Sequence, residues 1–256
     1  MMLKINNLFG GYTQGHDILQ GVDLEVSAGD SVGIIGLNGS GKSTFAKAII
    51  NCLPYRNGSL FFNGRDISQK STCELSQMGI VLFLQGGRIF EELSVYENLL
   101  LAAKSKRKID EIKKYKYFDD IVRLSKIRAD KLSGGERHRL ALKLSLAMCV
   151  LKDPALLILD EPSASLSPLL ANEMYQTLDE LRQDKKRGLS IILVEQNVVR
   201  AIDFCSSVII LENGKIAYAS AKKSNEKDVV QISDNKSFIL KNVQNIMFHK
   251  KIDYNE

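Results

Sequence analysis

Short apolar runs rich in Val, Ile and Leu recur along the chain and alternate with longer segments of helical pattern. Runs of this kind are typical of strands that are buried on both faces of a largely parallel sheet. The clearest of them are Val32–Ile35, Ile80–Phe83, Leu156–Leu159, Ile191–Val194 and Val208–Leu211. The pattern therefore predicts an α/β fold with a mainly parallel sheet.

The first thirty residues follow a different pattern. Leu3–Leu8 and Val22–Val26 alternate apolar and polar residues, with glycine-rich turn signals between and after them. Alternation with a period of two is typical of strands with one buried face. We therefore expect a small antiparallel β-subdomain at the amino terminus, beside the main sheet.

A third region, from about residue 91 to 136, reads as helical. Ser94 precedes a helical pattern and Glu97 follows three residues later, which is the spacing of a capping box. Lys104–Lys116 carries seven basic and two acidic residues, which suits a solvated helix face or a contact with anionic lipid headgroups. Leu140–Val150 alternates like a strand, but its residue types favour helix, so we predict a helix there.

Composition narrows the class of protein. The chain has 256 residues, of which 45% are hydrophobic and 25% charged, values typical of a soluble globular protein. Its net charge of +5 is too small to indicate nucleic-acid binding. The four cysteines are widely spaced without a C-x-x-C pair, which favours a reducing compartment. The sequence shows neither a signal-peptide pattern nor an apolar run long enough to span a membrane.

Residues 36–43 match the phosphate-binding pattern G-x-x-x-x-G-K-[ST], between the apolar run Ser31–Ile35 and the helix-like run Thr44–Cys52. Glycines let backbone N–H groups converge on phosphate oxygens, and a helix N-terminus adds a favourable dipole. We expect Lys42 to reach the β- and γ-phosphates of ATP and Ser43 to hold Mg²⁺. The predicted ATP-binding residues here are Gly36, Leu37, Asn38, Gly39, Ser40, Gly41, Lys42, Ser43 and Thr44.

A second element supplies carboxylates. The apolar run Leu156–Leu159 ends in Asp160 and Glu161. A carboxylate at the end of a buried strand suits Mg²⁺, and a second one can polarise an attacking water. We therefore assign Asp160 to the metal and Glu161 to catalysis.

The order of these motifs resembles that of the ATP-binding cassette (ABC) ATPases. Between the phosphate loop and Asp160 lies a match to the family signature: Leu132, Ser133, Gly134, Gly135 and Glu136. The resemblance runs from Leu3 to Ala219 and implies a P-loop NTPase (RecA-like) core with an antiparallel β-subdomain and an α-helical subdomain. It leaves residues 220–256 as a divergent tail.

The resemblance also implies roles for further residues. Tyr12 matches the aromatic residue that stacks on adenine, and Gln85 matches the glutamine that senses Mg²⁺ and the attacking water. The signature would contact the γ-phosphate bound to a second ATPase chain, so that two chains close two sites. Lys42, Glu161 and Gln196 form the implied catalytic set.

Two departures from the family pattern stand out. Residues 164–167 read Ala-Ser-Leu-Ser where the family usually has Ser-Ala-Leu-Asp, and Gln196 stands where a histidine is usual. Glutamine can donate a hydrogen bond to a phosphate but cannot carry the charge of an imidazolium. Either hydrolysis is slow, or glutamine suffices because Glu161 remains.

The sequence Val-Glu-Gln-Asn at 194–197 resembles the ATPases of branched-chain amino acid importers and their amide and urea relatives. This resemblance implies that the protein acts at the cytoplasmic face of a membrane and does not bind nucleic acid. It implies integral membrane permease subunits, a second identical or different ATPase chain, and an extracytoplasmic solute-binding protein as partners. An ABC exporter subunit and a regulatory subunit with weak hydrolysis are the alternatives.

Overall fold

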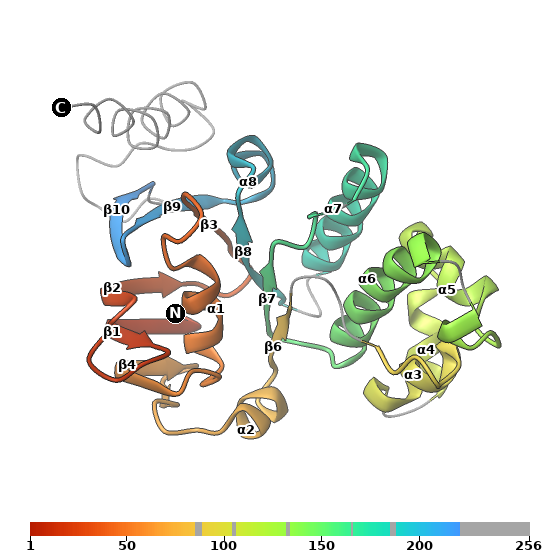
Figure 1. Ribbon diagram of the computed structural model, residues 1–256, viewed down its shortest axis with the longest axis horizontal. Coiled ribbons are helices and arrows are strands. Elements are labelled where there is room, and N and C mark those ends of the chain that lie inside the picture. Colours follow the sequence, from red (N-terminus) through yellow and green to blue (C-terminus); the bar gives the residue numbers. More distant parts are fainter. Residues whose placement is uncertain (85–88, 104–105, 132–133, 165, 185–187, 221–256) are drawn as a thin grey trace. The chain divides into compact units, whose positions relative to one another are not determined.

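The computed structural model describes residues 1–84, 89–103, 106–131, 134–164, 166–184 and 188–220. The chain divides into two compact units, one formed by Met1–Leu75 with Ser190–Glu256 and the other by Ser76–Leu189. Figure 1 shows the elements of each unit. None of the described helices is both long and apolar enough to cross a membrane.

The first unit contains an antiparallel sheet with the strand order β2-β1-β4-β5. Leu3, Ile5 and Leu8 are fully buried on one face of β1, as the alternating pattern predicts. The sheet is larger than the two segments predicted, because two strands from after the phosphate loop join it. Its strands are β1 (Leu3–Gly11), β2 (Leu19–Val26), β4 (Tyr55–Phe62) and β5 (Arg65–Asp66).

Strand β1 bulges between Asn6 and Phe9, where its register with β4 shifts. Gly58 of β4 lies opposite this bulge with a φ of +111°, and a Cβ there would press on the carbonyl oxygens of Asn6 and Asn7. Glycine is required because only a residue without a side chain tolerates both the dihedral and the close approach.

The first unit also holds the phosphate-loop strand and its neighbours. β3 pairs in parallel with β8 on one side and β9 on the other, and β10 adds to β9 antiparallel. Every residue of β3 and β8 is buried, which confirms the prediction of parallel strands covered on both faces. These strands are β3 (Ser31–Ile35), β8 (Ser190–Glu195), β9 (Ser207–Glu212) and β10 (Lys215–Ala219).

Helix α1 (Lys42–Ile49) lies against β1 and β8 (Figure 1). Its C-terminal end is held by Arg56 of β4, whose guanidinium donates to the Ala48 carbonyl and, at 2.7 Å, to the Ser68 carbonyl. Two further helices are α2 (Thr72–Gln77), which crosses the boundary between the units, and α8 (Val198–Phe204). Asn197 caps α8 by accepting from the Arg200 amide at 3.1 Å.

The second unit pairs β6 (Ile80–Phe83) in parallel with β7 (Leu156–Asp160). Its longest helix, α6 (Gly134–Leu151), packs against the smaller helices of the predicted helical region. Helix therefore prevails over strand at Leu140–Val150, as predicted. The other elements are α3 (Val95–Ala102), α4 (Lys106–Ile112), η1 (Lys116–Phe118), α5 (Asp119–Arg123), η2 (Ala129–Lys131) and α7 (Pro168–Gln183).

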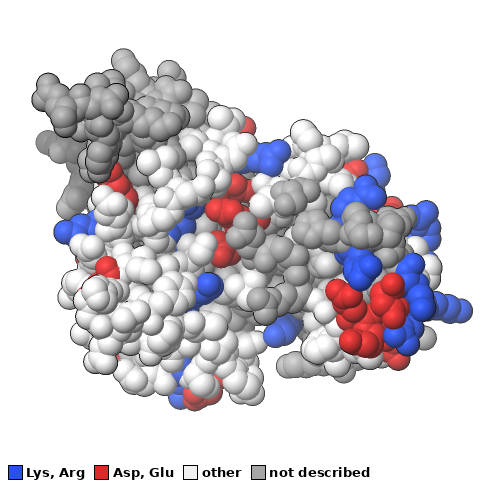
Figure 2. Space-filling view, in the orientation of Figure 1, with Lys and Arg blue, Asp and Glu red and all other residues white. Residues whose placement is uncertain are grey.

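Basic and acidic side chains lie side by side over the α3–α5 region (Figure 2). Lys113 lies 2.5 Å from Asp110, and Arg123 lies 3.5 Å from Asp120. The first of these pairs lies within the basic run 104–116 and favours the solvated-face interpretation, because the acidic partner offsets part of the positive charge of the run. The predicted tail 220–256 lies outside the described residues after Ser220.

Candidate functional site

The phosphate loop joins β3 to α1 within the first unit. Gly39 and Gly41 have φ values of +81° and +102°, which glycine adopts without strain. A Cβ on Gly36 would collide with the carbonyl oxygen of Leu211 and lie 2.6 Å from the Ser40 hydroxyl. Gly36 is therefore needed because no space exists for a Cβ, and Gly39 and Gly41 are needed because their backbone has a positive φ.

The side chain of Lys42 crosses this loop. Its ammonium lies 2.9 Å from the carbonyl oxygen of Gly36 and 3.0 Å from that of Leu37, and only 4% of the residue is exposed. Lys42 is also the first residue of α1, whose first-turn N–H groups lack acceptors within the helix. The loop thus presents a buried cation and a helix N-terminus together, which is an arrangement suited to phosphate.

Tyr12 lies one residue beyond β1, on a turn closed by a bridge between Thr13 and His16. Its side chain is 47% exposed. The Lys47 ammonium of α1 donates to the Tyr12 hydroxyl at 3.1 Å. The structure therefore places the predicted adenine-stacking residue next to the helix that starts at the phosphate loop.

The loop after β8 contains Gln196. Glu195 is the last residue of β8 and lies opposite Ile35 in the parallel register. Ile35 immediately precedes Gly36, the first glycine of the phosphate loop. The buried carboxylate of Glu195 accepts from the amides of Gln196 and Asn197 at 3.1 and 3.3 Å. Glu195 thereby fixes the backbone of this loop, and Gln196 is exposed next to the phosphate-loop strand.

The two predicted carboxylates lie at the end of β7 and directly after it, in the second unit. Asp160 is 3% exposed and is the last residue of the strand. Glu161 follows with a φ of +46°, a left-handed conformation that costs free energy in a residue other than glycine. Such conformations occur at functional sites but also in ordinary turns, and Asp153 has a φ of +56°. The catalytic role of Glu161 remains a prediction.

Some predicted residues fall outside the description. Gln85, Leu132 and Ser133 lie outside the described residues. Helix α6 begins at Gly134, so the helix start expected at Gly134 and Gly135, within the signature, is confirmed. The catalytic, metal and signature roles assigned to these positions remain predictions.

The residues predicted to hold Mg²⁺ suit this ion chemically. Ser43 offers a hydroxyl from the first turn of α1, and Asp160 offers a carboxylate from the end of β7. Mg²⁺ prefers oxygen ligands and usually combines one or two protein groups with phosphate oxygens and water. Among the described residues no three His, Cys, Asp or Glu side chains gather as a metal site.

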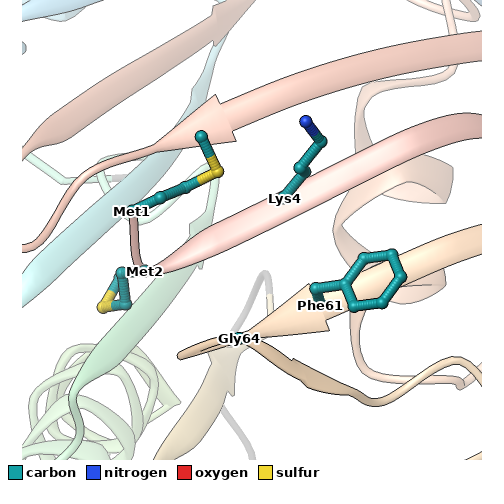
Figure 3. A pocket seen from close by; sticks show the side chains of 5 residues that line it. All are labelled: Met1, Met2, Lys4, Phe61 and Gly64. Atoms are coloured by element: carbon teal, nitrogen blue, oxygen red, sulfur yellow. The ribbon is translucent and has the colours of Figure 1, made fainter.

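A separate hollow of about 350 Å³ lies beside the start of β1 and the end of β4, the two central strands of the antiparallel sheet (Figure 3). It contains no residue of the phosphate loop, so it is not part of the candidate site. Its lining residues are Met1, Met2, Lys4, Phe61 and Gly64.

Sequence reasoning missed Lys47 and Glu195 as members of this site. Lys47 follows Ser43 by four residues, a spacing that places both on one helix face. Glu195 ends a buried strand, and a buried carboxylate at such a position signals a specific hydrogen-bonding role that its place in the Val-Glu-Gln-Asn sequence does not indicate.

A buried strand, a glycine loop and a helix that starts with a buried lysine define a P-loop nucleotide-binding protein of α/β fold. Comparison with known proteins specifies the family. The family model described as ABC transporter matches residues 19–164, more than half of the chain. The chain therefore belongs to the ABC transporter family, as an ATP-binding subunit with ATPase activity.

Relatives and solved structures agree with this assignment. A probable branched-chain amino acid transport ATP-binding protein, LivF of Archaeoglobus fulgidus, is 35% identical over 222 residues, covering 85% of this chain and 91% of the relative. The lipopolysaccharide export system ATP-binding protein LptB of Haemophilus influenzae is 29% identical, covering 84% and 88%. The ADP conformation of MJ1267, an ATP-binding cassette of an ABC transporter, aligns with a TM-score of 0.71 and 26% identity, covering 94% and 98%.

Proposed function

We propose that this chain is the ATPase subunit of an importer of the branched-chain amino acid type, acting at the cytoplasmic face of a membrane. The observation that carries the ATPase part is the Lys42 ammonium, buried within its glycine loop. The importer part is supported by the 35% identity to LivF and by the Val-Glu-Gln-Asn sequence at 194–197.

ATP binding comes first in the proposed cycle. The adenine stacks on Tyr12, while amides of residues 36–44 and the Lys42 ammonium bind the phosphates. Lys42 then exchanges its two carbonyl acceptors for phosphate oxygens, which form stronger charge-assisted hydrogen bonds.

The metal site in this proposal consists of Ser43, Asp160 and Gln85. When bound, Mg²⁺ neutralises charge on the β- and γ-phosphate oxygens. Secondary structure positions two of these residues: Ser43 lies in the first turn of α1, and Asp160 is the last residue of β7.

Glu161 acts as general base in the hydrolysis step. Its carboxylate accepts a proton from the water that attacks the γ-phosphate. Gln196 donates a hydrogen bond to the γ-phosphate from the loop that Glu195 fixes. Since Gln196 stays neutral, the electrostatic help that an imidazolium would give is absent at this position.

Transport requires partners. Two ATPase chains, identical or different, close on two nucleotides, and Leu132–Glu136 of one chain contacts the γ-phosphate bound to the other. ATP favours the closed pair and ADP does not, so hydrolysis reopens it. Residues 1–219 form the ATPase domain in this proposal, and its helical subdomain, about 91–136, transmits closure to membrane permease subunits. An extracytoplasmic solute-binding protein delivers the solute.

An exporter subunit is the second candidate function. The 29% identity to the export protein LptB over 84% of this chain supports it. The nucleotide cycle is the same in both cases, because the ATPase does not contact the solute. Co-purification with permease subunits and transport into or out of vesicles distinguish the two directions.

Steady-state ATP hydrolysis by the purified chain tests the ATPase proposal, with Glu161→Gln as control. We expect turnover that rises steeply with protein concentration and falls by a factor of about 10² or more in the variant, while ATP binding persists. Loss of binding together with turnover would contradict the role of Glu161. Binding without turnover in the unmodified chain would instead favour a regulatory subunit, or one that needs a different ATPase partner.

A further inference from the structure

The ammonium of Lys47 lies beyond the hydroxyl end of the Tyr12 ring. It is 3.1 Å from the phenol oxygen but 5.4 Å from the ring centroid. Because the ammonium is so much closer to the oxygen than to the ring centre, it does not cover a face of the ring. The contact is a charge-assisted hydrogen bond that leaves both faces available for stacking.

The backbone on which Tyr12 stands is fixed by other contacts. The His16 amide donates to the Thr13 carbonyl at 3.0 Å, and the Ile18 amide donates to the Gly10 carbonyl at 3.0 Å. At the end of the same turn, the Tyr55 hydroxyl donates to Asp17 at 2.9 Å, and burial together with this bond raises the pKa of Tyr55. What these contacts leave undetermined is the orientation of the half-exposed Tyr12 ring.

Lys47 connects this ring to the phosphate site through α1. Ser43 and Lys47 are four residues apart in the helix, so they share one face, and the helical rise separates them by about 6 Å. The Lys47 side chain therefore ties the ring to the same rigid helix that begins at the phosphate loop.

We propose that Lys47 is a positioning residue for the nucleobase: it holds the Tyr12 hydroxyl and so sets the ring at a defined distance from the phosphate loop. The inference rests on the proposed ATP-binding role of Tyr12 and the phosphate loop. A ring held in place before the base arrives loses less side-chain entropy on binding, which increases the affinity for ligands that carry a base.

Two other roles for Lys47 make different predictions. As a simple positive charge near an anion site, Lys47 would strengthen binding of any polyphosphate. As a cation in the last turn of α1, it would stabilise the helix without a preference among ligands. A positioning role is specific to ligands with a base and depends on the Tyr12 hydroxyl.

The test measures the affinities for ATP and for inorganic tripolyphosphate by calorimetry, with Mg²⁺, in a Glu161→Gln background that prevents consumption of ATP. We expect Lys47→Met and Tyr12→Phe each to weaken ATP binding by about three- to tenfold and to leave tripolyphosphate binding unchanged. The double variant should bind ATP no more weakly than either single variant, and Lys47→Arg should restore most of the affinity. Lys215→Met, which removes an exposed cation from β10 of the same unit, is the matched control.

Equal weakening of ATP and tripolyphosphate binding by Lys47→Met would overturn the proposal in favour of a general charge effect. Unchanged ATP affinity in Lys47→Met, or additive losses in the double variant, would also overturn it. Failure of the unmodified chain to bind ATP would be a different result, because it would refute the proposed function itself.

Discussion

Asn98 and Phe90 exchange two hydrogen bonds: the Asn98 side-chain oxygen accepts from the Phe90 amide, and its nitrogen donates to the Phe90 carbonyl, both at 2.9 Å. The Asn98 side chain is fully buried and also donates to the Ser94 carbonyl at 3.0 Å. One buried amide thus pairs with the backbone of the segment before α3 as a neighbouring strand would.

This pairing predicts the effect of Asn98→Leu. The substitution keeps the branched shape of the side chain but leaves the Phe90 amide and carbonyl without their partner, at an expected cost of about 2–4 kcal/mol in unfolding free energy. Urea unfolding followed by circular dichroism measures it. Leu101→Ala on the same helix, where the side chain is 58% exposed, should change stability by less than about 0.5 kcal/mol. Equal effects of the two variants would contradict the structural role of Asn98.

Arg56 predicts a second stability effect. Its guanidinium bridges the Ala48 carbonyl at the end of α1 and the Ser68 carbonyl, and burial lowers its pKa. Arg56→Met leaves these carbonyls without their cation and should lower the unfolding free energy by about 2–4 kcal/mol. Arg56→Lys should recover only part of this loss, because an ammonium cannot reproduce the planar fork. Arg65→Met, at an exposed position, is the control, and urea unfolding measures both variants. Equal unfolding midpoints for Arg56→Met and Arg65→Met would refute the structural role of Arg56.

Lys42 predicts an effect on ligand binding. Lys42→Ala removes the cation from the phosphate loop, so ATP affinity should fall by about tenfold or more. Tripolyphosphate affinity should fall with it, because the contact is to phosphate and not to the base. Calorimetry with Lys215→Ala as control provides the measurement. Retention of ATP affinity by Lys42→Ala would place the phosphates elsewhere.

Glu74 predicts a pH-dependent feature. Its carboxylate accepts from the Lys70 ammonium at 2.7 Å and from the Ser71 amide at 2.9 Å, and these bonds lower its pKa to about 2. Because the folded-state pKa lies below the ordinary value of 4.5, the stabilising bonds are fully present above pH 4.5 and are lost as the pH falls toward 2.

Carbon-13 NMR of the Glu74 carboxyl group measures this shift directly. Between the two pKa values the carboxyl should stay ionised in the unmodified chain, and Lys70→Met should raise its midpoint toward 4.5. A midpoint near 4.5 in the unmodified chain would show that these exposed bonds do not persist in solution.

Local signals predicted much of the fold because they act within a few residues. The capping box at Ser94 and Glu97 is present, with the Glu97 amide donating to Ser94 at 3.2 Å. Helix α7 was not predicted, although Ser167 caps it and Pro168 occupies its first turn. Both are standard helix-start signals that act within a few residues, so the start of this helix was predictable from its own sequence.

Pairing between distant segments could not be predicted from local pattern. β4 and β5 join the amino-terminal sheet from beyond the phosphate loop, and nothing near Tyr55–Phe62 specifies β1 as its neighbour. The contact of Lys47 with Tyr12 has the same origin, since it joins residues 35 positions apart. The motif residues of the candidate site were identifiable because their spacing is local, whereas their supporting residues depend on tertiary structure.

The carbonyl oxygens of Gly36 and Leu37 accept from the Lys42 ammonium and therefore compete with any incoming anion for this cation. An anion captures the ammonium only by outcompeting two carbonyl dipoles, which must then be rehydrated or find new donors. A single negative charge gains little in this exchange, whereas a polyphosphate gains several charge-assisted contacts at once. The carbonyl contacts of Lys42 therefore favour a polyphosphate over a single anion such as chloride as the ligand of this ammonium.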